Sequence, residues 1–254
     1  MHNAMPRDRT DRRVSLLNGR FDPLTMDETI DRVAALLESD QRSWLCTVNV
    51  AILMMMREDP ELHRFVERAT ICVADGQPLV WLSRLKRTPL PERVAGIELI
   101  EAVAARAEQK DWGLYLLGAT PEAVNRAAEA LARRHPALRL CGIDDGYFSG
   151  AQAGDRARAV RESGADILFV AMGVPYQEQF ISQNWGALGV RVAIPVGGSF
   201  DVLAGLHRRA PVWIQRLGLE WAFRVGQEPR RLWKRYLVTN MQFLWLAARD
   251  LTGL

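Results

Sequence analysis

Short apolar runs alternate with longer amphipathic segments along most of the chain. The short runs have the length and composition of buried strands, and the longer segments have the three- and four-residue spacing of apolar positions that is typical of helices. We expect strands at Trp44–Asn49, Ile71–Asp75, Gly113–Ala119, Leu138–Ile143, Ile167–Gly173 and Arg191–Val196. We expect helices at Asp27–Leu37, Gly96–Lys110, Pro121–His135 and Gly150–Glu162. This alternation predicts an α/β fold with a Rossmann-like, mainly parallel sheet and helices on both of its faces.

The pattern changes at Pro211. Residues 211–254 have helical periodicity, no strand candidate and four of the eight tryptophans of the chain. We therefore expect an α/β domain over residues 15–210, followed by a helical appendage over residues 211–254. The opening segment, up to Arg20, is basic and lacks the apolar region of a secretory signal. We expect it to be a loose arm, with residues 1–14 as its flexible basic part.

The charge of the chain is concentrated in the predicted appendage. The formal net charge of the 254 residues is only +3, which does not indicate a nucleic-acid partner. Residues 211–254 contain seven arginines and lysines against three acids, mixed with aromatic residues on predicted helices. That combination suits the headgroup level of a bilayer, and packing of a terminal helical pair on the core is an alternative that is compatible with it. No apolar window approaches the roughly 18 residues that a spanning helix needs, so we expect any membrane contact to be peripheral.

The three cysteines, Cys46, Cys72 and Cys141, lie far apart in apolar runs. An odd number of widely spaced cysteines predicts buried, reduced thiols and hence a cytosolic compartment.

Ligands of parallel α/β sheets bind beyond the carboxyl ends of the strands. The six predicted strands are followed there by the segments TVN, ADGQP, GATPE, DDGYF, GVPYQE and GGSFD. The third segment contains Gly118 and the fourth contains Tyr147. We interpret Asp144 and Asp145, which precede Tyr147, as loop residues.

Asp75 ends the second predicted strand. A carboxylate held in this place can act as a general base towards an attacking hydroxyl group. The competing interpretation is that Asp75 only caps the helix that starts at Gly76.

Thr47 and Asn49 lie at the end of the first predicted strand, with the spacing of two residues that places side chains on one side of a strand. They can bind sugar hydroxyls or a phosphate, although Asn49 can equally be the cap of the helix that begins near Ala51.

Gly173 and a proline-fixed turn lead into a helix whose first turn contains Gln177 and Glu178. The free N–H groups of such a helix start suit a diphosphate, whereas Glu178 can simply complement the helix dipole.

Two glycines in the segment Val196–Asp201 allow a ligand to approach the backbone at Gly197, with Asp201 nearby. The alternative is that the two glycines only form a tight turn. Arg93, in a proline-bounded loop, can pair with an anion or be an ordinary surface arginine.

Two kinds of cofactor site have no signature in the sequence. The four histidines and three cysteines lack metal-ligand spacing, and no Asp-x-Asp pair is placed to hold a metal-bound nucleotide sugar. The Gly-x-Gly-x-x-Gly pattern of dinucleotide-binding folds is also absent. We therefore expect neither a metal nor another cofactor.

Taken in order, these motifs resemble the WecG/TagA/CpsF family of bacterial glycosyltransferases, also called glycosyltransferase family 26. The matching segments are TVN, ADGQPLVW, PERVAGIELI, LLGATPE, GYF, AMGVPYQE, VGGSFDVLAG, RAPVWIQRLGLEWAFR and EPRRLWKRY, which together cover nearly the whole chain from about residue 15.

The resemblance implies an inverting, metal-independent enzyme that moves a sugar from a UDP-sugar, commonly UDP-N-acetylmannosamine, to a polyprenyl-diphosphate-linked sugar during cell-surface polysaccharide synthesis. It implies that Asp75 is the base, that Thr47, Asn49, Arg93 and Gln177 bind substrate, and that the appendage brings arginines to the active site. Arg224 and Arg231 are the candidates.

The resemblance also implies a peripheral location on the cytoplasmic face of the membrane. Away from the membrane, self-association into a homo-oligomer would cover the aromatic surface.

The sequence departs from the family pattern at two places. Tyr176 stands where lysine is common, and the segment after Asn49 is strongly apolar. A glucosyltransferase of exopolysaccharide assembly would have the same scaffold, so glucose stands beside N-acetylmannosamine as the expected sugar. Two other classes of protein stay open, namely a soluble UDP-sugar oxidoreductase or epimerase and a non-catalytic scaffold recruited to membranes.

Overall fold

The computed structural model describes residues 13–39 and 41–252, apart from the side chain of Arg231. The predicted flexible arm, residues 1–14, lies outside the described residues except for its last two positions.

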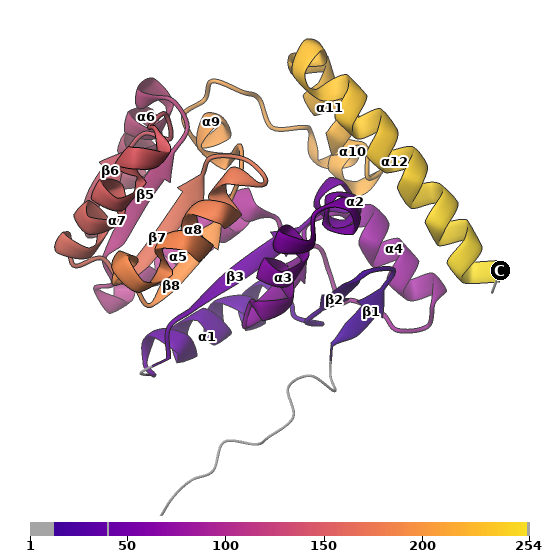
Figure 1. The fold of residues 1–254 in the computed structure, drawn as a ribbon, viewed down its shortest axis with the longest axis horizontal. Helices are drawn as coiled ribbons and strands as arrows, with labels where there is room; N and C mark the ends of the chain where they lie inside the picture. Colours follow the sequence, from indigo (N-terminus) through magenta and orange to yellow (C-terminus); the bar gives the residue numbers. More distant parts are fainter. Residues whose placement is uncertain (1–12, 40, 253–254) are drawn as a thin grey trace, which may run out of the picture.

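A six-stranded sheet forms the centre of the molecule (Figure 1). Its strands run in the order β4-β3-β8-β7-β5-β6, and every neighbouring pair is parallel. All six predicted strands are present, as β3 (Ser43–Val48), β4 (Ile71–Ala74), β5 (Leu114–Gly118), β6 (Leu140–Asp144), β7 (Ile167–Ala171) and β8 (Val192–Pro195). The predicted α/β class is therefore confirmed. One detail was wrong, because Asp144 is the last residue of β6 and not a loop residue.

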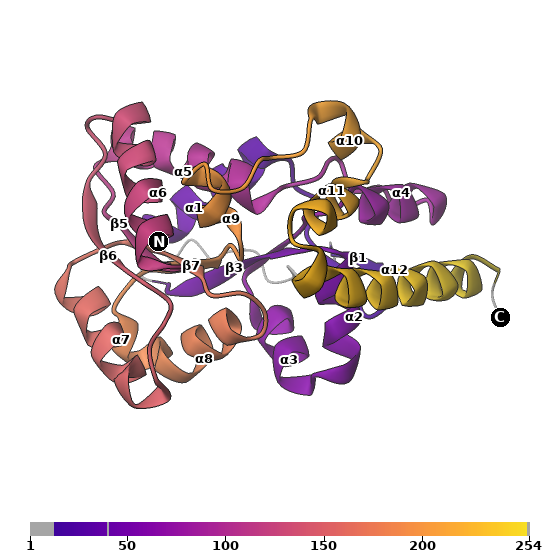
Figure 2. The same ribbon diagram turned by 90° about the horizontal axis from the view of Figure 1, so that it is seen from above.

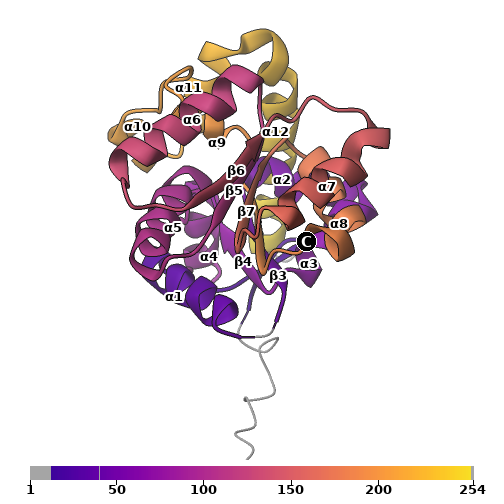
Figure 3. The same ribbon diagram turned by 90° about the vertical axis from the view of Figure 1, so that its left-hand side faces the viewer.

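Helices cover both faces of the sheet, as Figure 3 shows with the sheet between two layers. Successive strand residues point to opposite faces, so that Leu116 packs in one core cluster and Leu117 in the other. One face is covered by α1 (Met26–Leu37), α5 (Gly96–Lys110), α6 (Pro121–Arg134) and α9 (Ser199–Leu203). The other is covered by α2 (Val50–Glu58), α3 (Pro60–Arg68), α7 (Ala153–Glu162) and α8 (Tyr176–Leu188), and α4 (Gln77–Leu85) contributes to the same core. A short 3-10 helix, η2 (Gly150–Gln152), precedes α7.

A hairpin occupies part of the segment that the sequence predicted to be loose. Its strands, β1 (Val14–Leu16) and β2 (Gly19–Phe21), pair antiparallel, and Leu16 and Phe21 are fully buried. Arg13 forms an ion pair with Asp22 at 3.0 Å and donates a hydrogen bond to the Ala69 carbonyl. Strands of three residues are too short for the alternation of apolar and polar positions to reveal them.

The region after Pro211 is helical, as predicted. It forms α10 (Val212–Arg216), α11 (Glu220–Gln227) and α12 (Pro229–Thr252). Helix α12 lies along α2, which Figures 1 and 2 show from two directions. Leu232, Tyr236 and Phe243 of α12 are buried. Within residues 13–39 and 41–252, no helix is long and apolar enough to cross a membrane.

The cysteines are free thiols, but they are not equally buried. Cys46 and Cys72 lie in the core, as predicted, whereas Cys141 is only half-buried. The prediction for Cys141 was wrong because β6 is an edge strand, none of whose residues is fully buried.

Candidate active site

Asp75 directly follows β4 and is half-buried beside the start of α5. Its backbone N–H donates to the Val48 carbonyl at 2.9 Å, which ties it to the end of β3. Its Oδ2 accepts a hydrogen bond of 3.4 Å from the backbone N–H of Gly96, the first residue of α5. The alternative role as the cap of α4 is not observed, because that helix has Gly76 at its cap position and no side-chain cap.

The surroundings of Asp75 make its carboxyl a proton acceptor at neutral pH. Burial raises its pKa from 3.8 to about 7, and the nearby charge of Glu220 adds to the rise. The positive charges of Arg93 and Arg224 and the Gly96 N–H act in the opposite direction. A carboxyl group with a pKa near 7 is suited to general-base chemistry at physiological pH.

Arg93, in the loop before α5, contacts Gln215 and Glu220 of the C-terminal helices. The backbone of the next residue, Val94, donates to the Ala74 carbonyl and fixes this loop to the end of β4. The guanidinium of Arg93 is largely buried and donates to Glu220 Oε2 at 2.7 Å and to Gln215 Oε1 at 2.9 Å. It also lies 3.4 Å from Oε2 of Glu98. Arg93 is therefore not an ordinary surface arginine, since carboxylates from α5 and α11 already pair with it.

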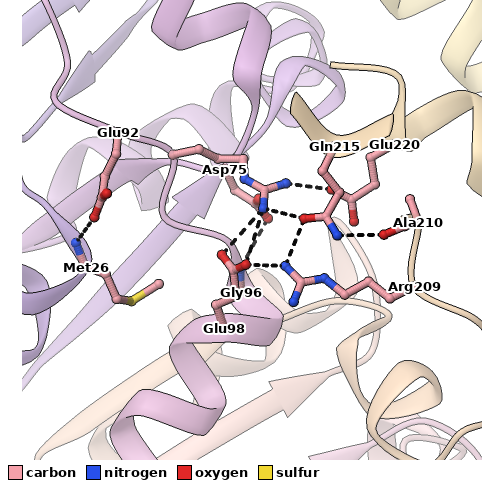
Figure 4. Close-up of polar contacts among 10 residues, drawn as sticks. Met26, Asp75, Glu92, Gly96, Glu98, Arg209, Ala210, Gln215 and Glu220 are labelled. Carbon is pink, nitrogen blue, oxygen red and sulfur yellow. Dashed lines mark hydrogen bonds and ion pairs between the residues drawn. The ribbon is translucent and has the colours of Figure 1, made fainter. Parts of the chain in front are cut away.

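A second arginine completes this network. Arg209 forms an ion pair with Glu98 and a hydrogen bond of 3.2 Å with Gln215 Oε1. Gln215 in turn donates to the Ala210 carbonyl at 2.6 Å (Figure 4). These contacts fasten α10 and α11 to the first turn of α5. No single pattern in the sequence predicted a role for Glu98, Arg209, Gln215 or Glu220. Each is an ordinary polar residue in its own segment, and only the matching motifs PERVAGIELI and RAPVWIQRLGLEWAFR contained a signal for them.

Arg224, in α11, is the appendage arginine that the structure places near Asp75. Burial disfavours its charge, but Tyr236, Glu220 and Asp75 favour it, so that the pKa of Arg224 is raised overall. The hydroxyl group of Tyr236, in α12, is hydrogen-bonded to Arg224. Arg231 belongs to α12, and its side chain lies outside the described part of the chain.

Thr47 and Asn49 have different roles in the structure. Thr47 is buried near the end of β3, and a Cβ at Gly96 would lie 3.5 Å from its hydroxyl oxygen. Thr47 therefore adjoins the same helix start that contacts Asp75. Asn49 caps α2, because its Oδ1 accepts the N–H of Ile52 at 3.0 Å.

Gln177 and Glu178 are both buried in the first turn of α8. Gln177 Oε1 accepts the backbone N–H of Gly197 at 2.9 Å, and its amide nitrogen donates to Glu178 Oε1 at 2.8 Å. Gln177 therefore connects the loops that follow β7 and β8. Burial raises the pKa of Glu178 to about 7, although the hydrogen bond from Gln177 lowers it. The positive φ of Gly173, 75°, forms the turn before the helix.

The remaining candidates are spread along the carboxyl ends of the strands. Gly118 has a φ of 133°, and a side chain there would collide with the backbone of Ala171. Asp201 lies in the short helix α9, after β8. Tyr147 is exposed and follows β6, so that β3, β8, β7 and β5 separate it from the strand of Asp75 in the sheet.

Two hollows lie beside the network. One, of about 590 Å³, is bounded by α5, α6 and α9 and contains Glu101 and His135. A smaller one, of about 230 Å³, lies between α10 and the loop of Arg93. Among the described residues, no group of three or more His, Cys, Asp or Glu residues is arranged to hold a metal ion.

Comparison with known proteins identifies the class of protein that carries this site. The model of the glycosyl transferase WecG/TagA/CpsF family matches residues 14–254. The chain is 32% identical to the N-acetylglucosaminyldiphosphoundecaprenol N-acetyl-beta-D-mannosaminyltransferase of Bacillus subtilis (strain 168), over 76% of the chain and 74% of that relative. It is 31% identical to the enzyme of the same name from Bacillus spizizenii, over 79% of the chain and 77% of that relative.

The chain therefore belongs to the WecG/TagA/CpsF family and is a glycosyltransferase. The family membership that the sequence motifs predicted is confirmed, and it removes the oxidoreductase, epimerase and scaffold alternatives.

Proposed function

We propose that this protein is an inverting, metal-independent transferase that moves N-acetylmannosamine from its UDP derivative to a polyprenyl-diphosphate-linked N-acetylglucosamine. The observation that carries the proposal is the half-buried carboxyl of Asp75, whose pKa is raised to about 7 at the carboxyl end of β4. The names of the two Bacillus relatives supply the transferred sugar and the acceptor. The UDP carrier is an expectation from the sequence motifs.

The reaction is a single displacement at the anomeric carbon. A hydroxyl group of the acceptor sugar gives its proton to Asp75 as its oxygen forms the new glycosidic bond. The bond between the anomeric carbon and the UDP oxygen breaks on the opposite face, and the electron pair leaves with UDP. Inversion of the anomeric centre follows from this geometry, and a positioned base of this kind contributes about 10²–10⁴-fold to the rate.

Positive charge on the protein stabilises the departing diphosphate. Arg224, already close to Asp75, and Arg231 are the candidate side chains, and the N–H groups at the start of α8 are the candidate backbone donors. These groups take the place of a metal ion in the proposed mechanism. Thr47, near the end of β3 and beside the start of α5, is the candidate side chain for a sugar hydroxyl.

One residue beside the proposed diphosphate site bears on which sugar is transferred. Tyr176, which replaces the lysine common in the family, is exposed at the first position of α8, beside the proposed diphosphate site. Its lack of charge makes glucose the alternative donor sugar to be tested.

The C-terminal helices are proposed to touch the cytoplasmic face of the membrane that holds the acceptor. Trp233, Leu237, Met241 and Trp245 of α12 are all exposed and follow one another at four-residue intervals. Side chains at this spacing lie on one face of a helix, here the one opposite to the buried residues that contact the core. Aromatic and aliphatic side chains with flanking arginines favour the interface of a bilayer.

The first experiment is UDP release from UDP-N-acetylmannosamine, UDP-N-acetylglucosamine and UDP-glucose, with polyprenyl-diphosphate-linked acceptors and with or without EDTA. We expect acceptor-dependent release with UDP-N-acetylmannosamine, unaffected by EDTA and reduced at least about 100-fold in Asp75→Asn. Circular dichroism verifies that the variant is folded.

Each component of the proposal has its own contrary result. Full activity in Asp75→Asn would exclude Asp75 as the general base. Loss of activity in EDTA would show that the reaction needs a metal ion. Release from UDP-glucose alone would correct the sugar.

A further inference from the structure

The smaller hollow, of about 230 Å³, is lined by three arginines. Arg93 comes from the loop before α5, Arg209 from the segment before α10, and Arg216 from the end of α10. Gln77, two residues after Asp75, forms part of the same wall. The hollow therefore opens next to the loop that holds the proposed base.

The three arginines differ in how their charges are compensated. Arg93 pairs with Glu98 and Glu220, and Arg209 pairs with Glu98, so these carboxylates hold both guanidinium groups in place. Within the described part of the chain, no carboxylate pairs with Arg216, which is exposed. The three arginines and the two carboxylates that pair with them have a net charge of +1. A guanidinium group without a carboxylate partner, beside others already oriented, favours phosphate oxygens.

This hollow and the proposed donor site are formed by different elements of the fold. Gln177 follows β7, which β3 and β8 separate from β4. A displacement with inversion requires separate places for the two substrates, because the attacking hydroxyl and the leaving group lie on opposite faces of the anomeric carbon.

The rim of the hollow is apolar on the side of α10. Val212 lines the hollow, and Val212 and the adjacent Trp213 are 61% and 62% exposed. A ligand with a charged head and an apolar chain can therefore place its head among the arginines while its chain leaves over these two residues.

We propose that this hollow binds the diphosphate of the lipid-linked acceptor, with Arg216 as its principal ligand and Val212 and Trp213 at the exit of the polyprenyl chain. This site deepens the proposed function and rests on it, since the acceptor's diphosphate is the anion that it assigns. The diphosphate of the donor is the other source of the same chemistry, and the experiment separates the two.

The test compares Arg216→Gln with Arg208→Gln in the full-length protein. Arg208 is an exposed arginine one position before Arg209 and does not line the hollow, so Arg208→Gln is the matched control. The KM for the donor and the KM for a short-chain polyprenyl-diphosphate-linked N-acetylglucosamine are measured separately. We expect Arg216→Gln to raise the acceptor KM about tenfold and to change the donor KM less than about twofold, because a charged hydrogen bond is lost only at the acceptor. Arg208→Gln leaves both values unchanged.

A binding measurement without turnover makes the result independent of the proposed reaction. Binding of a short-chain polyprenyl diphosphate without sugar, followed by tryptophan fluorescence, is expected to weaken by a similar factor in Arg216→Gln. The corresponding monophosphate is expected to bind more weakly to the wild type. Its affinity is expected to fall by a smaller factor in Arg216→Gln.

Two results would overturn the assignment. An equal rise of the donor KM in Arg216→Gln would assign the hollow to UDP. Unchanged binding and unchanged KM values in this variant would show that the hollow is not a phosphate site. If the wild type transfers no sugar but Arg216→Gln still weakens binding of the polyprenyl diphosphate, the proposed function fails and the site stands.

Discussion

Arg93 donates a hydrogen bond to Glu220 at 2.7 Å, and this contact joins the loop behind Asp75 to the first residue of α11. The two residues are 127 positions apart in the sequence. Arg93 lowers the pKa of Asp75 and Glu220 raises it, so that the pair places opposite charges beside the proposed base. The C-terminal helices therefore affect the proton affinity of Asp75 as well as covering it.

Replacing Glu220 is expected to change the pH dependence of transfer. In Glu220→Gln the negative charge that raises the pKa of Asp75 is lost, while Arg93, Arg224 and the Gly96 N–H still lower it. The acidic limb of kcat/KM should therefore move to lower pH, by about half a pH unit or more. Glu98→Gln removes an equal charge from another partner of Arg93 and is the control. We expect it to move the acidic limb by less than Glu220→Gln does. An unmoved limb in a folded Glu220→Gln variant would contradict this prediction.

Asp75 is expected to reduce the stability of the fold at neutral and alkaline pH. Its folded pKa, about 7, exceeds its ordinary value of 3.8, so the unfolded chain releases the proton first as the pH rises. Stability is consequently lost between about pH 4 and 7, and Asp75→Asn avoids the loss. We expect the variant to be more stable by about 1–2 kcal/mol at pH 8.5, a rise of a few °C in Tm, and to gain much less at pH 4.5. Thermal unfolding at both pH values measures this, and an equal gain at both would show that ionisation is not the cause.

Tyr236 is expected to position Arg224. Tyr236→Phe removes the hydroxyl group that is hydrogen-bonded to the half-buried arginine but keeps the ring, which lies 6.2 Å from that of Trp221. We expect a loss of about 1–3 kcal/mol in the free energy of unfolding and a fall in kcat that exceeds any change in the donor KM. Urea titration and steady-state kinetics provide the two values. Wild-type kcat in this variant would mean that Arg224 does not depend on Tyr236.

Gly118 is expected to be irreplaceable at the end of β5. Its φ of 133° is unfavourable for other residues, and an added Cβ would collide with the backbone of Ala171. Gly118→Ala should therefore destabilise the fold by at least about 3 kcal/mol. Gly186→Ala, in α8 with no atom within 4 Å of the added Cβ, should instead stabilise it by about 0.5–1 kcal/mol. Chemical denaturation of both variants tests the contrast, which equal effects would refute.

The exposed face of α12 is expected to bind anionic membranes. Because Phe243 and Ala247 on the opposite face belong to the core, point substitutions are better suited to a test than deletion of the helix. The double variant Trp233→Ser, Trp245→Ser should bind vesicles of anionic lipid at least about tenfold more weakly, with a Tm close to that of the wild type. Leu206→Ser, an exposed apolar position outside the C-terminal helices, is the control. Undiminished vesicle binding in the double variant would exclude this face.

The sequence alone determined the sheet, most of the helices around it and the family. Runs such as Ile167–Gly173 are apolar throughout because strands of a parallel sheet are buried on both faces, and such runs can be recognised without any tertiary information. A helix cap was also predictable. Asn49 precedes an apolar helix, which is a preferred position for a capping asparagine, and its side chain accepts the N–H of Ile52. The three-residue strands of the first hairpin were missed because they contain too few positions for a period to appear.

Only the tertiary structure decided which charged groups surround Asp75. Glu98, Arg209, Gln215 and Glu220 are unremarkable in their own segments, and they meet because the C-terminal helices return to the start of α5. The pKa of a carboxyl group depends on burial and on charges within a few ångströms, and neither can be obtained from the local sequence. The position of Asp75 at the end of a strand could therefore be predicted from the sequence. Its proton affinity and the arginine-lined hollow near it depend on the tertiary structure.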